Sequence, residues 1–184
     1  MSYECLKSDG RRRGLTGDWE AWFRAADGLY NRFLERTGES PFYFHEVASV
    51  GFLASASALA GFIPLAEYEV IKRAHHDKRI KVDGRADLWF DAGPRCYSFE
   101  FKRAYLAVTT GNLAAVLKEA NDNVACIDRD EFHYAAGAMV ARVRDLERDS
   151  IYRAFADSDT VDFAYRIGPP GENGAFVFLK LRTS

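Results

Sequence analysis

The chain has 184 residues, of which 48% are hydrophobic and 28% are charged, so it can bury one core without disulfides or metals to hold it together. Its 25 basic and 27 acidic residues give a net charge of −2, which excludes a protein that coats nucleic acid through overall positive charge but allows a local basic rim. The three cysteines, Cys5, Cys96 and Cys126, have no C-x-x-C spacing. They predict a protein of the reducing cytoplasm without a disulfide framework or a zinc site.

The first 38 residues predict a polar lead followed by an amphipathic helix. Residues 1–15 carry an arginine cluster at 11–13, and we expect a flexible tail, with an arm that touches phosphate as the alternative. After Thr16 or Asp18 as the N-cap, apolar residues recur at helical spacing. We expect this helix to end at Gly38, since glycine suits the residue after a helix.

An uncharged stretch of 20 residues, 47–66, has the length of a membrane span. Its serines and small side chains, its glycine and proline, and its lack of basic residues on the N-terminal side argue against a lipid-facing helix. We therefore predict no membrane partner, and a helix from Phe42 or Phe44 to Ala60 that is buried between other elements.

The first core strand is predicted from Tyr68 to Ala74, and it runs into the densest basic segment of the chain. Such a segment is usually a solvated face, but beside a catalytic edge it would grip the backbone of a nucleic acid. The adjacent His75 and His76 are not predicted as metal ligands, because neighbouring side chains point apart on a strand or a helix. The basic residues of this segment are Lys72, Arg73, Lys78, Arg79, Lys81 and Arg85.

The most informative stretch is residues 84–102, with the sequence G-R-A-D-L-W-F-D-A-G-P-R-C-Y-S-F-E-F-K. Its halves alternate apolar and polar residues around a Gly-Pro turn at 93–94, which predicts a hairpin of two strands. If the hairpin is centred on that turn, Asp87 lies opposite Glu100, and Lys102 projects to the same face as Glu100. Like charges opposite one another destabilise a sheet, so the pair favours a hard cation such as Mg²⁺ between the carboxylates.

The rest of the chain completes an α/β pattern. Thr109 or Thr110 caps a helix whose apolar stripe would cover one face of the sheet, and a short helix is expected at 150–156. Further strands are predicted at residues 134–143, 161–167 and 175–181, the last two as a terminal hairpin that extends the sheet. The order from 42 to 143 is α-β-β-β-α-β, which predicts a single domain with a mixed central sheet flanked by helices.

Asp87, twelve further residues and then Glu100-Phe101-Lys102 resemble the signature of the PD-(D/E)xK nuclease superfamily, with Ala86 at the position of its proline. The resemblance covers about 100 of the 184 residues. It implies the restriction-endonuclease-like fold, whose core has the order α-β-β-β-α-β. In that fold the aspartate stands on the second core strand and E-x-K on the third.

The resemblance also implies a catalytic site. Asp87, Glu100 and the backbone carbonyl of Phe101 would hold Mg²⁺ or Mn²⁺, and Lys102 would orient the attacking water and stabilise the oxyanion. In the family an acidic residue on the helix before the sheet often reaches the metal, and Glu46 matches that role. Its other interpretation is a carboxylate that complements the dipole of its helix.

The expected function is that of a metal-dependent nuclease acting on DNA in repair, restriction or a mobile element. A chain of this length commonly acts as a homodimer when it cuts both strands. One alternative is a nuclease fold that binds nucleic acid or protein without cutting. Another is a structural protein in which Lys102 merely neutralises Glu100 in a surface ladder of salt bridges.

Overall fold

The computed structural model describes residues 2–74, 79–104, 109–171 and 173–182. Its strands are β1 (Glu4–Lys7), β2 (Ile63–Arg73), β3 (Lys81–Asp91), β4 (Cys96–Arg103), β5 (Tyr134–Arg142), β6 (Phe163–Ile167) and β7 (Ala175–Leu181). They form one seven-stranded mixed sheet in the order β1-β6-β7-β5-β4-β3-β2. Only β4 and β5 pair in parallel among these neighbours.

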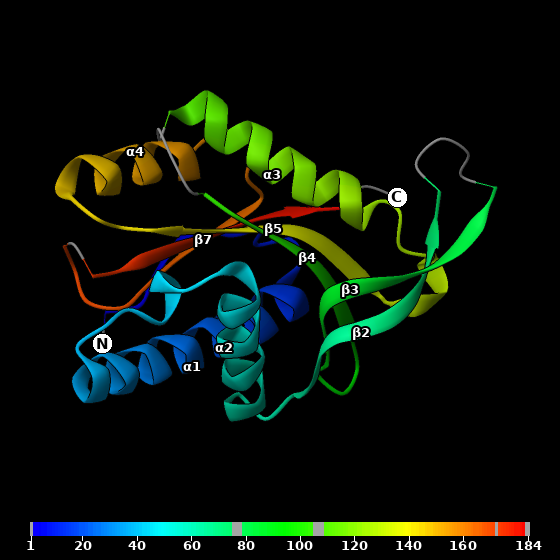
Figure 1. Cartoon of the computed structure of the whole chain (residues 1–184), viewed down its shortest axis with the longest axis horizontal. Helices are drawn as coiled ribbons and strands as arrows, with labels where there is room; N and C mark the ends of the chain where they lie inside the picture. Colours follow the sequence, from blue (N-terminus) through cyan, green and yellow to red (C-terminus); the bar gives the residue numbers. More distant parts are fainter. Residues whose placement is uncertain (1, 75–78, 105–108, 172, 183–184) are drawn as a thin grey trace.

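Helices cover both faces of this sheet, so the domain has three layers (Figure 1). The helices are α1 (Arg13–Thr37), α2 (Glu46–Leu59), α3 (Thr110–Val124) and α4 (Leu146–Ala156). The first two contact one face and the last two the other. The predicted α/β class with a mixed central sheet is thereby confirmed, and the terminal hairpin of β6 and β7 extends the sheet as expected. Among the described residues, no helix combines the length and hydrophobicity that a bilayer span requires.

The predicted register of the central hairpin is confirmed along its paired part. Leu88 lies opposite Phe99, and the pairing continues to Asp91 opposite Cys96. The hairpin turn is fixed to α1, because the Arg95 guanidinium donates hydrogen bonds to both oxygens of the Asp18 carboxylate at 2.8 and 3.1 Å. This bidentate contact holds the register on which the positions of the candidate site residues depend.

The N-terminal part of the chain differs from the expectation. Residues expected to form a flexible lead include β1, which pairs with β6 and forms one edge of the sheet, and Arg153 fixes it through a 2.8 Å ion pair with Glu4. Helix α1 begins at Arg13, before both expected N-caps, and Arg12 makes no side-chain cap there. Pairing with a distant strand supplies order that local polarity does not predict.

The segment before the sheet is also divided differently from the prediction. Pro41–Tyr43 forms a 3₁₀ turn, and α2 begins only at Glu46, where the His45 ring accepts the backbone N–H of Ala48 at 3.4 Å. Strand β2 begins at Ile63, five residues before the predicted start, because its pairing with β3 begins opposite Asp91. A histidine cap is not among the usual signals for a helix start.

The core beside the candidate site consists of aromatic side chains between α1 and the sheet. Trp22 packs on Phe99 with ring centroids 5.1 Å apart and on Phe90 at 5.0 Å. The indole N–H of Trp22 donates to the backbone carbonyl of Leu53 in α2 at 2.8 Å. Helices α1 and α2 therefore pack together against the same face of β3 and β4.

On the opposite face, α3 lies directly against the backbone of β5. A Cβ atom at Gly137 would lie 2.4 Å from the backbone nitrogen of Asn121, which is far inside van der Waals contact. Gly137 pairs with Glu100 in the neighbouring strand. The close approach of α3 therefore occurs beside Glu100 and contributes to its burial.

This packing generates a stability prediction. The substitution Gly137→Ala is expected to lower the free energy of unfolding by about 3 kcal/mol, because backbone atoms of α3 cannot yield as a flexible side chain would. In the control Gly28→Ala, an exposed helical glycine with open space around it, the same methyl group should raise stability by about 0.5 to 1 kcal/mol. Urea unfolding of both variants measures the difference, and equal stabilities would contradict the close approach.

Candidate functional site

Strands β3 and β4 part at the predicted site. Their paired residues end at Leu88 opposite Phe99, and the next pair along the chain would have been Asp87 with Glu100. Instead, the Oδ2 atom of Asp87 accepts the backbone N–H of Phe101 at 2.6 Å. The side chain of Asp87 therefore lies in the fork between the strands and takes a donor that the strand ladder would otherwise use.

The ladder on the other side of Asp87 is interrupted as well. Strand β2 pairs Ala66 with Leu88 and Tyr68 with Ala86, and Glu67 between them has a backbone φ of 53°. This left-handed conformation is uncommon for a residue with a side chain. The charge of Glu67 contributes to raising the pKa of Asp87. A further carboxylate, which was not among the predicted site residues, therefore lies on the strand beside the aspartate.

Glu100 is buried, with 7% of its side chain exposed, and its Oε1 atom lies 2.7 Å from the Nζ atom of Lys72. Burial raises the pKa of the Glu100 carboxyl, and the charge of Asp87 raises it further, while Lys72 opposes the shift. The pKa of Asp87 is raised as well. Burial is the largest cause, and the hydrogen bond from the Phe101 backbone lowers the pKa in part.

Glu46 and Lys102 complete the group. Burial raises the pKa of Glu46, and the charge of Asp87 raises it further, while Lys102 and a hydrogen bond from the Arg103 backbone lower it. The charge of Lys102 also lowers the pKa of Asp87 and Glu100. The structure thus brings Asp87 and Lys102 within electrostatic reach of both Glu46 and Glu100.

Lys102 also meets a partner on the helix that covers the site. Its Nζ atom lies 3.6 Å from the Oε1 atom of Glu119 in α3, whose side chain is 63% exposed. Such an exposed pair is weak. Lys102 is therefore not the direct partner of Glu100 that a simple salt-bridge ladder would require.

The oxygen atoms at this fork fit a hard divalent cation in their chemistry, since carboxylates are ligands that Mg²⁺ and Mn²⁺ prefer. No ion pair joins Glu46 or Asp87 to a basic side chain among the described residues. Within residues 2–74, 79–104, 109–171 and 173–182, no group of three or more histidine, cysteine, aspartate or glutamate side chains is arranged to hold a metal. The expected set is smaller, with the carboxylates of Asp87 and Glu100 and the Phe101 carbonyl.

The basic segment lies largely on an arm formed by β2 and β3, which extends away from the other strands (Figure 1). Arg73 and Lys81 contact Asp128 at 3.5 and 2.6 Å, and these cations lower the pKa of that carboxyl to about 2. Arg85 lies 3.8 Å from Glu67. Much of the expected basic surface therefore faces carboxylates of the same chain.

Part of this segment stays exposed. The side chains of Lys81 and Arg85 are 55% and 68% exposed, and Arg79 is exposed as well. Lys78, together with His75 and His76, lies outside the described residues. Lys72 differs from the others because its ammonium points to Glu100.

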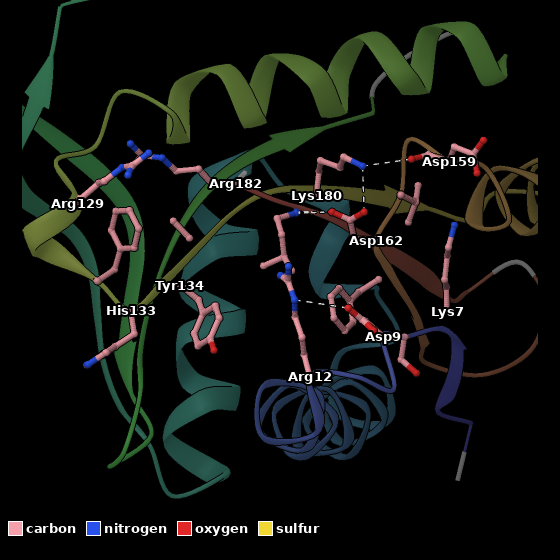
Figure 2. Close-up of a pocket in the computed structure, with 16 residues that line it drawn as sticks. Lys7, Asp9, Arg12, Arg129, His133, Tyr134, Asp159, Asp162, Lys180 and Arg182 are labelled. Atoms are coloured by element: carbon pink, nitrogen blue, oxygen red, sulfur yellow. Dashed lines mark hydrogen bonds and ion pairs between the residues drawn. The ribbon is translucent and has the colours of Figure 1, made fainter. Parts of the chain in front are cut away.

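A cavity of about 940 Å³ lies away from the fork and was not predicted (Figure 2). Its lining mixes Arg129 and Arg182, which lie side by side, with Lys180 ion-paired to Asp162 at 3.0 Å. Four segments far apart in the sequence contribute to it, so no local pattern could have indicated it. None of the predicted site residues lines it.

Comparisons of this chain with protein-family models, with curated proteins and with solved structures found no match. The fold alone assigns the chain to the class of α/β domains with a mixed sheet. The site is defined by the geometry of the fork alone.

Because the pKa of Asp87 is raised, we predict that Asp87→Asn increases the thermal stability of the protein by an amount that depends on pH. A folded state with a raised carboxyl pKa binds a proton that the unfolded state has already released, so the wild type loses stability as pH rises from about 3.9 through the raised value. Asparagine keeps the acceptor for Phe101 without the charge. We expect the variant to melt at a higher temperature at pH 8, with the gain disappearing below about pH 4.

Thermal unfolding followed by circular dichroism between pH 3.5 and 8 measures this gain. The control Asp130→Asn removes an exposed carboxylate and should show no such growth with pH. A melting temperature of Asp87→Asn that stays below the wild type at pH 8 would contradict the desolvation of Asp87.

Proposed function

We propose that this protein is a metal-dependent nuclease that hydrolyses phosphodiester bonds, with DNA as its substrate. The observation that carries the proposal is the group at the fork, where Glu46, Asp87 and Glu100 each have a pKa raised by burial. The charge of Asp87 raises the pKa of the other two. Repelling carboxylates that are partly withdrawn from water favour a cation among them.

Asp87, Glu100 and the carbonyl of Phe101 are the proposed ligands, with Glu46 acting through water. Lys72 contacts Glu100 directly, whereas Glu46 and Asp87 make no ion pair with a basic side chain among the described residues, so a divalent cation would compensate their charges. A bound Mg²⁺ or Mn²⁺ supplies a polarised scissile phosphate and a water of lowered pKa.

The protein's own groups supply positioning and a positive charge. The N–H of Phe101 holds the Asp87 carboxylate, and the cover of α3 keeps Glu100 away from water. Lys102 is 28% exposed and only weakly held by Glu119, so its ammonium can act as a point charge beside the attacking water and the phosphate oxyanion.

The arrangement of the elements supports the resemblance on which the proposal draws. The order α2-β2-β3-β4-α3-β5 agrees with the α-β-β-β-α-β core of the restriction-endonuclease-like fold. Asp87 is on the second of these strands and E-x-K on the third. The exposed Lys81 and Arg85 on the arm are proposed to contact the nucleic-acid backbone, and two copies of the chain would cut both strands of a duplex.

Cleavage of plasmid and single-stranded DNA with Mg²⁺ or Mn²⁺ tests this function. Asp87→Ala and Lys102→Met are each expected to lower the rate roughly 100-fold or more, because each removes charge stabilisation at the reacting phosphate. The matched control Lys118→Met removes an exposed lysine that is paired with Asp122, and it should cleave at the wild-type rate. Cleavage that survives both site substitutions would place the activity elsewhere.

A second candidate is a nuclease fold that binds nucleic acid or protein without cutting. It is favoured by the internal partners of the two expected metal ligands, since Asp87 accepts the Phe101 N–H and Glu100 contacts Lys72. Retention of nucleic acid that weakens as salt rises, with no cleavage at any metal concentration, would support this candidate over the first.

A further inference from the structure

Lys72 belongs to the candidate site although it is not part of the E-x-K motif. The sequence groups it with the basic residues that would face nucleic acid, yet its side chain is only 21% exposed and its Nζ atom lies 2.7 Å from the Oε1 atom of Glu100. Lys102, the motif lysine, lies instead near Glu119. The cation that directly contacts the proposed metal ligand is therefore the lysine of β2.

The position of this ammonium is set by the backbone around it. Lys72 pairs with Val82 in the ladder of β2 and β3, and it forms an isolated bridge with Ile127 after α3. Its stem crosses Gly84, where a Cβ atom would lie 2.8 Å from the Cδ atom and 3.1 Å from the Cγ atom of Lys72. Because Gly84 has no side chain, the lysine can reach across β3 to Glu100.

We propose that Lys72 is a positioning residue that occupies the cation position beside Glu100 and gives way when a divalent cation binds. The inference rests on the proposed function, since it assumes that Glu100 is a metal ligand. An ammonium at hydrogen-bond distance from a ligand oxygen repels a second cation strongly at the effective dielectric constant of a protein. Lys72 therefore holds the buried carboxylate in place without metal and weakens the affinity of the site for metal.

Mn²⁺ binding, measured by isothermal titration calorimetry at pH 8, tests this role without any need for catalysis. Lys72→Met keeps the length of the stem and removes the charge, and we expect Mn²⁺ to bind about tenfold more tightly than to the wild type. Damage to the fold would weaken binding, so a gain in affinity separates competition from a structural role. The control Lys118→Met removes a lysine from an exposed ion pair and should leave the affinity unchanged.

A second variant, Gly84→Ala, displaces the stem of Lys72 without removing its charge and should also tighten Mn²⁺ binding. Circular dichroism and thermal unfolding confirm that each variant is folded. Equal or weaker binding by both Lys72→Met and Gly84→Ala, with the wild type binding Mn²⁺, overturns the role of Lys72 and leaves the proposed nuclease intact. Absence of Mn²⁺ binding in all folded variants overturns the metal site and the competition together.

Discussion

The hydrogen bond from the Phe101 backbone to the Asp87 carboxylate is the interaction on which the candidate site depends. It forms where β3 leaves β4, because the paired residues end at Leu88 and Phe99. A continued ladder would have placed Asp87 and Glu100 as a repelling pair at a regular sheet position. At the fork, the Asp87 carboxylate instead accepts the Phe101 N–H, and its charge still raises the pKa of Glu100.

The elements around the fork determine how much water reaches it. Helix α3 approaches the backbone at Gly137, the partner of Glu100, and an aromatic layer on the other face holds the strands against α1 and α2. Burial raises the pKa values of these carboxylates, and the same removal of water strengthens the attraction between their charged forms and a cation. The packing of the helices therefore changes the electrostatics of the Asp87 and Glu100 carboxylates.

The arm of β2 and β3 connects the site to the surface. Lys72 points from the arm into the fork, while Lys81 and Arg85 stay exposed. The arm in turn lies against the segment after α3, where Asp128 contacts both Arg73 and Lys81. An anionic ligand on the arm would compete with the Asp128 carboxylate for these two cations.

The sequence by itself determined the hairpin and its register, because alternation around a Gly-Pro turn depends only on neighbouring residues. It therefore placed Asp87 near Glu100, and glycine correctly marked the end of α1 at Gly38. Only the tertiary structure decided that the ladder stops before these two residues and that Lys72 rather than Lys102 contacts Glu100. The contact of Lys72 depends on the open space at Gly84, and the ladder stops where Asp87 accepts the Phe101 N–H, so both outcomes arise from contacts between strands and not from neighbouring residues.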